Sequence, residues 1–170
     1  MDIVIPIYKP SDDRISNLDF ILNALSTFGV NEVTIAEQTY PNCNSVKNLL
    51  KSYSHFKYVP VDLNIDTFNK SKLLNKVAEK CKSEIIWFLD CDVYLNYKYV
   101  IDNTPNDIDF MRPFEQIVLL HKQETDYLKT HKKVVMDDTR HNAYNQDGKY
   151  SFIIRKSLFN KISGYDEEYS

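Results

Sequence analysis

The chain has 170 residues, of which 43% are hydrophobic and 26% are charged, and its formal net charge is −3. A chain of this length can form one domain that buries roughly 70% of its unfolded surface. We therefore expect a single domain over residues 1–170. The balance of charges argues against nucleic acid as a partner, because nucleic-acid-binding domains carry a concentrated excess of lysine and arginine.

The residue types exclude several other kinds of site. The apolar runs are far shorter than the roughly 20 residues of a membrane-spanning helix, and the N-terminus lacks the features of a signal peptide. The three cysteines, Cys43, Cys81 and Cys91, have neither the CxxC spacing of a zinc site nor the even number of a disulfide framework. Only three glycines occur, so there is no glycine-rich phosphate loop. We predict a cytoplasmic protein without a transmembrane segment.

The first ninety residues alternate between strand-like and helix-like segments. Helix signals include Ser11 as a candidate N-cap and Gly29 as a stop. Strands that alternate with helices pair in parallel through right-handed crossovers. This order predicts an α/β fold in three layers, with helices on both faces of a mostly parallel sheet. The expected strands span residues 3–8, 32–36, 56–61 and 84–89, and the expected helices span 15–28, 46–53 and 69–81.

The pattern is looser after residue 92, and no repeat or linker marks a second domain. The expected elements are a strand at 107–112, a mostly helical segment at 115–131, a polar loop at 137–149, a strand at 150–154 and a short helix at 156–162.

Polar or aromatic residues stand at the end of each of the first, second and fourth predicted strands. Tyr8 ends the first strand, Glu37 the second, and Asp90 and Asp92 directly follow the fourth. Ligands of open α/β sheets bind beyond the carboxyl ends of the strands, so these side chains are expected at one edge. Residues two apart on an extended segment point the same way, and two carboxylates suit Mg²⁺ or Mn²⁺. The alternative is a pair of aspartates that only caps a turn.

Two stretches resemble a known enzyme family. Residues 66–75, DTFNKSKLLN, and 87–93, WFLDCDV, resemble the F-N-R-x-K-L-L-N helix and the D-V-D-L strand end of the β-1,4-galactosyltransferases. More broadly, they resemble the inverting GT-A glycosyltransferases of the family 2 group, to whose acceptor region residues 155–167 are similar. The resemblance implies a Rossmann-like GT-A fold. It also implies transfer of a hexose of galactose type from a UDP-sugar to a carbohydrate or glycoconjugate acceptor, assisted by Mn²⁺ or Mg²⁺.

The resemblance further implies which residues bind the donor. Pro6 and Tyr8 would border the nucleotide pocket, and Glu37 would lie near the uracil and ribose. Phe68 and Lys70 would lie against the donor, with Lys70 facing its phosphates. The family has arginine at the position of Lys70, and lysine lacks its bidentate fork, so a looser grip on phosphate is expected. The plainer alternatives are a rim aromatic for Tyr8 and solvated charges for Glu37 and Lys70.

The metal and catalytic groups follow from the same resemblance. Asp92 would bind the metal directly, and Asp90 would lie near the ribose or a metal-bound water. The family's W-G-x-G-x-E-D stretch, which carries the catalytic base, does not occur in these 170 residues. Asp166 and Glu167 are the nearest acidic candidates for a base, although carboxylates in a terminal tail are usually solvated. We therefore expect a C-terminally incomplete transferase domain, or a domain that has lost its chemistry.

Two other functions stay open. An apolar strand followed by D-C-D-V also fits the nucleophile motif of haloacid dehalogenase-type phosphatases, and the acids at residues 137–138 imitate their distal pair. Against this function, three β-α units precede Asp90. The other possibility is a non-catalytic module that binds a sugar nucleotide or a protein. Among the histidines, His141 in the polar loop is the one that we consider as a possible metal neighbour.

Overall fold

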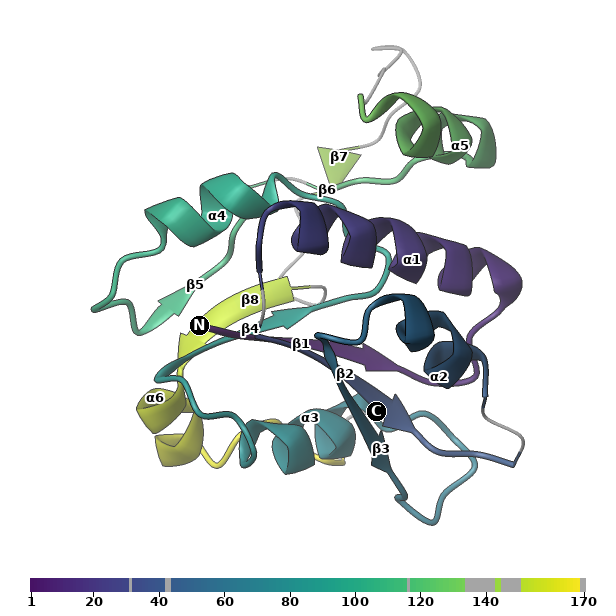
Figure 1. Cartoon of the computed structure of the whole chain (residues 1–170). Coiled ribbons are helices and arrows are strands. Elements are labelled where there is room, and N and C mark those ends of the chain that lie inside the picture. Colours follow the sequence, from purple (N-terminus) through teal and green to yellow (C-terminus); the bar gives the residue numbers. More distant parts are fainter. Residues whose placement is uncertain (31, 42–43, 116, 134–142, 145–150, 169–170) are drawn as a thin grey trace.

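The computed structural model describes residues 1–30, 32–41, 44–115, 117–133, 143–144 and 151–168. At its centre is a six-stranded sheet in the order β3-β2-β1-β4-β8-β5 (Figure 1). Strands β1 to β4 pair in parallel, and β8 runs antiparallel to both of its neighbours. The strands are β1 (Asp2–Ile7), β2 (Val33–Gln38), β3 (Lys57–Val61), β4 (Ile85–Leu89), β5 (Phe110–Met111) and β8 (Ser151–Arg155).

The central strands read as nearly continuous apolar runs because both faces of the sheet are covered. Every residue of β1, β2 and β4 is buried. Strand β3 lies at the edge of the sheet and is only partly buried, and there it tolerates Pro60, which lacks the N–H of a central strand. The four strands predicted in the first ninety residues are thus confirmed, with bounds shifted by one or two residues.

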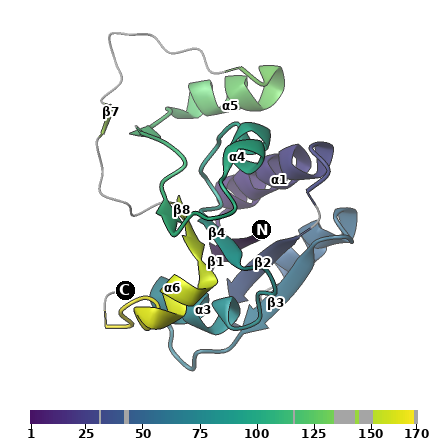
Figure 2. The same ribbon diagram turned by 90° about the vertical axis from the view of Figure 1, so that its left-hand side faces the viewer.

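Helices cover both faces of the sheet (Figures 1 and 2). One face carries α1 (Asp12–Thr27), α2 (Ser45–Leu49), which continues into the 3-10 turn η1 (Leu50–Ser52), and α4 (Tyr97–Asn103). The other face carries α3 (Lys70–Ala78) and α6 (Lys156–Lys161).

Neighbouring residues of a strand contribute to opposite cores, since side chains alternate along a strand. Trp87 and Leu89 of β4 pack beneath α1 and α4, whereas Phe88 of the same strand packs against α3 and α6. The predicted three-layer sandwich is therefore confirmed.

Strand β8 is joined to β4 by a buried side-chain network as well as by the ladder. The indole Nε1 of Trp87 donates to the Ser151 hydroxyl over 2.7 Å, and that hydroxyl donates to the Phe88 carbonyl over 3.0 Å. Trp87 and Ser151 are 0% and 1% exposed. A buried indole N–H needs such a partner, so Ser151 fixes β8 beside the parallel strands.

The region after β4 differs from the sequence-based expectation. The predicted helix at 115–131 is wrong in its first half, which forms β6 (Ile117–Val118), paired antiparallel with β7 (Ala143–Tyr144). Helix α5 (Lys122–His131) begins only after a capping box, in which the His121 amide donates to the Glu124 carboxylate over 2.7 Å. Helix α4 was not predicted, and the strand expected at 107–112 is reduced to the two residues of β5.

The structure also bears on the predictions for the cysteines and for a membrane-spanning helix. Cys81 and Cys91 are free and buried, whereas Cys43 lies outside the described residues. The acids at 137–138 and His141 also lie outside them, so the phosphatase-like pair and the histidine metal neighbour stay predictions. Of the helices that the structure describes, none has the length and apolar character needed to span a bilayer.

Candidate functional site

The order of the strands puts the topological switch point of the sheet, where open α/β folds have their crevice, between β1 and β4. From β1 the chain builds the sheet outward through β2 and β3, then returns to the other side of β1 with β4. In α/β sheets, ligands bind outside the carboxyl ends of the strands at such a reversal. The residues that follow the two strands here are Tyr8 and Lys9 after β1, and residues 90–92 after β4.

The segment after β4 turns sharply. The Val93 amide donates to the Asp90 carbonyl over 3.2 Å, which closes a turn. Asp90, whose side chain is 18% exposed, pairs with Lys70 of α3, whereas Asp92, 41% exposed, lies 3.8 Å from the guanidinium of Arg14 on α1. The prediction of one extended segment carrying both aspartates is therefore wrong. Their cationic partners come from opposite layers of the sandwich.

The two carboxylates nevertheless influence each other. The pKa of Asp90 is raised to about 6, chiefly by burial; Lys70 opposes this rise, and the negative charge of Asp92 contributes to it. A buried carboxylate beside a second negative charge is stabilised in its ionised form by any positive charge added nearby.

An aromatic cluster, formed by Tyr8, Tyr40 and Phe68, lies at the end of β1. The ring of Tyr8 stacks on Phe68 with centroids 5.7 Å apart, and meets Tyr40 edge-on at 5.7 Å. The Tyr8 hydroxyl donates to the Asp66 carbonyl. The Lys9 ammonium lies 5.0 Å from the Tyr8 ring centroid, and its hydrogen bond with Tyr8 raises the pKa of Lys9. Stacked rings with an adjacent cation are a chemically suitable surface for a nucleobase and phosphate.

Gln38, buried at the end of β2, fixes the loop that carries Phe68. Its amide nitrogen donates to the carbonyls of Ile65 and Thr67 over 3.1 and 2.8 Å. Its amide oxygen accepts from the Asn69 backbone over 2.9 Å. Gln38 therefore sets the start of α3 and, with it, the position of Lys70. The sequence placed this glutamine at a strand end but gave no reason to expect a bracing role.

Two of the predicted donor residues are buried. Pro6 lies within β1, opposite Ala36. Glu37 is 0% exposed, and its Oε2 accepts from the Tyr58 hydroxyl over 2.5 Å. Its Oε1 has no hydrogen-bond partner among the described residues, and burial raises the pKa of Glu37, partly offset by the bond from Tyr58. In this conformation Glu37 presents no surface to a ligand, so its predicted contact with uracil stays a prediction.

Helix α3 also holds the segment after α6, through an amide clamp formed by Asn69 and Asn75. The Asn75 side chain accepts from the Tyr165 amide over 2.9 Å, and donates to the Tyr165 carbonyl and the Glu167 carboxylate, each over 3.0 Å. Asn69 donates to the Glu167 carbonyl over 3.1 Å. Gly164, with φ +73°, permits the close approach, because an added Cβ would lie 2.4 Å from the Asn75 amide oxygen. The sequence motif contained both asparagines, but their roles were not predicted.

The two candidate bases differ in how they are held. Asp166 is exposed, and its carboxylate accepts only a local bond from the Glu168 amide over 3.0 Å. Glu167 is also exposed, but the amide clamp fixes both its carboxylate and its carbonyl to α3. The expectation of a solvated tail therefore fits Asp166 better than Glu167.

Whether these residues could hold a metal ion depends on which ligand atoms their side chains offer. The described residues contain no group of three or more His, Cys, Asp or Glu side chains arranged to hold a metal. Asp90 and Asp92 are the acidic side chains that follow β4 at the crevice. Mg²⁺ and Mn²⁺ are commonly held by one or two carboxylates, with water and substrate phosphates completing the shell. The residues fit an ion that binds together with a phosphate-bearing ligand.

Comparisons with known proteins bear on the fold. No protein-family model and no curated protein matches the sequence. A mannosyltransferase from Pyrobaculum calidifontis in complex with GDP-Man and Mn²⁺ has a similar structure, with a TM-score of 0.61 at 12% identity over 98% of this chain and 47% of its own. Glucosyl-3-phosphoglycerate synthase from Mycobacterium tuberculosis, in complex with Mn²⁺, UDP and phosphoglyceric acid, gives 0.58 at 12% identity over 93% of this chain and 56% of its own.

A cytidylyltransferase from Leptospira borgpetersenii gives a TM-score of 0.57 at 14% identity, over 95% of this chain and 63% of its own. The chain thus spans about half the length of the mannosyltransferase. At such low identity the likeness establishes the fold. It is the Rossmann-like α/β fold common to GT-A glycosyltransferases and nucleotidyltransferases.

Proposed function

We propose that this chain is the donor-binding part of a metal-assisted, inverting glycosyltransferase. The donor is a UDP-hexose, of galactose type, and the acceptor is a hydroxyl of a carbohydrate or glycoconjugate. The observation that carries the proposal is the group of residues at the switch point between β1 and β4: Asp90 pairs with Lys70, Asp92 lies near Arg14, and the aromatic cluster follows β1. It is supported by two structural neighbours, which bind GDP-Man with Mn²⁺ and UDP with Mn²⁺.

Each group at the crevice has a role in donor binding. The aromatic cluster receives the base by stacking. Lys70 attracts the phosphates, which compete with Asp90 for its ammonium. Asp92, with Asp90 beside it, would hold Mn²⁺ or Mg²⁺. When bound, such an ion supplies positive charge that stabilises a departing diphosphate.

The transfer itself is a single displacement. The acceptor oxygen forms a bond to the anomeric carbon while the bond from that carbon to UDP breaks, and the electron pair leaves with UDP. A carboxylate takes the proton from the acceptor hydroxyl and must lie within hydrogen-bond reach of it. Of the two candidate bases, Glu167 is favoured because the amide clamp fixes its position.

The metal assignment is tested with Asp92→Ala. The variant should lose metal-dependent UDP binding, measured by calorimetry with and without Mn²⁺. Asp92 is 41% exposed, so its removal leaves the core intact. Asp102→Ala is the matched control, since Asp102 is a similarly exposed aspartate whose partner is Lys98 on α4. Unchanged affinity in Asp92→Ala would remove Asp92 from the metal site.

A thermal-shift panel separates the proposal from its alternatives. UDP, UDP-galactose, GDP-mannose and CTP are each tested with and without Mn²⁺. Stabilisation by uridine compounds with metal supports the proposal, whereas stabilisation by CTP alone favours nucleotidyl transfer. Binding without donor turnover indicates the non-catalytic module, and release of phosphate from an aryl phosphate indicates the phosphatase.

A further inference from the structure

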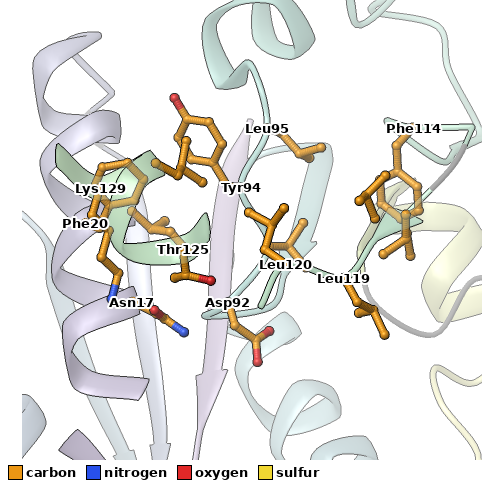
Figure 3. A pocket seen from close by; sticks show the side chains of 15 residues that line it. Asn17, Phe20, Asp92, Tyr94, Leu95, Phe114, Leu119, Leu120, Thr125 and Lys129 are labelled. Carbon is orange, nitrogen blue, oxygen red and sulfur yellow. The ribbon is translucent and has the colours of Figure 1, made fainter. Parts of the chain in front are cut away.

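Asp92 also lines a cavity. This α1–α5 pocket, of about 490 Å³, lies between helix α1, the segment after β4, the segment around β6 and helix α5 (Figure 3). Its volume is within the range of about 300–1,000 Å³ that is typical of small-molecule sites. Asp92, which we propose as a metal ligand of the donor site, also lines this pocket.

The walls of the pocket are chiefly apolar. Phe20 comes from α1, Tyr94 and Leu95 follow β4, and Phe114 and Leu120 flank β6. The polar ends of Asn17 and Asp92 lie toward one edge of the pocket in Figure 3, and the Asp92 carboxylate points away from the apolar side chains. A ligand with one apolar end and one polar end matches this division.

Contacts between α5 and the first part of the chain hold the walls in place. Leu128 of α5 is only 3% exposed. The Lys129 ammonium donates to the Ser16 hydroxyl of α1 over 2.8 Å. Helix α1 also contacts the segment after β4, where the ring centroids of Phe20 and Tyr94 are 5.2 Å apart. The cavity is therefore formed before any ligand binds.

We infer that the α1–α5 pocket binds the apolar aglycone of the acceptor, which is a glycoside whose sugar lies at Asp92. The inference rests on the proposed function, because the acceptor hydroxyl must approach the anomeric carbon beside the metal ligands. An unsubstituted sugar would leave the apolar walls in contact with water. An aryl or alkyl group removes that surface from water, and so binds more tightly.

The test compares p-nitrophenyl and methyl β-glycosides of glucose, galactose and N-acetylglucosamine, with binding measured by NMR titration on the whole chain. The aryl glycosides should bind about tenfold more tightly than the methyl glycosides, as expected from burial of an aromatic ring. Thr125→Phe fills the pocket and should remove this preference. Thr130→Phe, the same change at an exposed position of α5, should leave it intact.

A second variant guards against misfolding of Thr125→Phe. Leu119 lines the pocket but is 59% exposed, so Leu119→Ser perturbs only its rim. It should weaken aryl glycoside binding by about threefold. Equal binding of aryl and methyl glycosides, no binding of either, or an undiminished preference in both pocket variants would overturn the inference. UDP affinity in the presence of Mn²⁺ is measured on the same samples, so failure of the donor site is seen separately.

Discussion

The chain before Asp90 and the chain after it are stabilised in different ways. Strands β1 to β4 contain five or six residues each and pair with one another directly. Of the strands described after Asp90, β8 contains five residues and pairs with β4, whereas β5, β6 and β7 contain two residues each. The later region depends on side chains that reach back to the earlier one. The edge that we propose for the donor thus belongs to a sheet whose strands support one another, whereas the region that we propose for the acceptor is positioned by fewer contacts.

The largest effect is expected for Gly164→Ala, which disturbs a contact between the later region and helix α3. The added Cβ would lie 2.4 Å from the Asn75 amide oxygen, in a residue whose φ of +73° already disfavours alanine. Strain and the loss of the amide clamp should together cost about 2–4 kcal/mol of unfolding free energy. Urea denaturation followed by circular dichroism measures this change.

Gly29→Ala is the matched control for this substitution. Gly29 also has a positive φ, +71°, but nothing lies within 4 Å of an added Cβ. Only the backbone cost of about 1–2 kcal/mol is expected. Equal losses in the two variants would mean that the amide clamp contributes nothing.

The next largest effect is expected at the junction of β4 and β8. Ser151→Ala leaves the buried indole N–H of Trp87 without its acceptor. An unsatisfied buried donor costs about 1–3 kcal/mol, so the midpoint of urea unfolding should fall accordingly. Ser157→Ala, on the exposed surface of α6, should leave the midpoint nearly unchanged. A Ser151→Ala midpoint equal to that of the wild type would mean that the ladder alone holds β8.

The smallest effect, and one located within the parallel strands, is expected for Glu37→Gln. Burial raises the folded-state pKa of Glu37, so the folded protein retains a proton that the unfolded chain releases. Stability is therefore lost as pH rises through the raised pKa. Between pH 4 and pH 8, the stability of the variant should therefore fall less than that of the wild type. Thermal unfolding in a series of buffers measures this difference. The exposed control Glu79→Gln should follow the wild type, and a Glu37→Gln profile that does so too would contradict the assignment.

The two regions also differ in how far the sequence predicts them. Continuous apolar runs such as residues 85–89 identify buried parallel strands, because no other element of that length hides both of its faces. Near β6, by contrast, residues 117–120 are apolar and run straight into a helix, and periodicity alone cannot separate the two. The strand there exists only through pairing with β7, some 25 residues away.

In the candidate site, too, some features could be predicted from the sequence and others could not. Tyr8 and Asp90 follow the adjacent strands β1 and β4, as the strand pattern predicts, and their roles in binding stay predictions. The turn after Asp90 was not predicted, and neither were the partners of the two aspartates, Lys70 and Arg14, which come from helices on opposite faces of the sheet. The bracing role of Gln38 likewise depends on a loop distant in sequence.

Trp87 is the single tryptophan of the chain, and it lies fully buried where β4 meets β8, with its ring centroid 6.1 Å from that of Tyr97. Its emission therefore comes from one place in the molecule. Because an indole emits at longer wavelength once water reaches it, the native fluorescence spectrum reports whether this junction is closed, without any attached dye. A ligand that loosens or tightens the junction of β4 and β8 would shift the emission wavelength before the rest of the sheet unfolds.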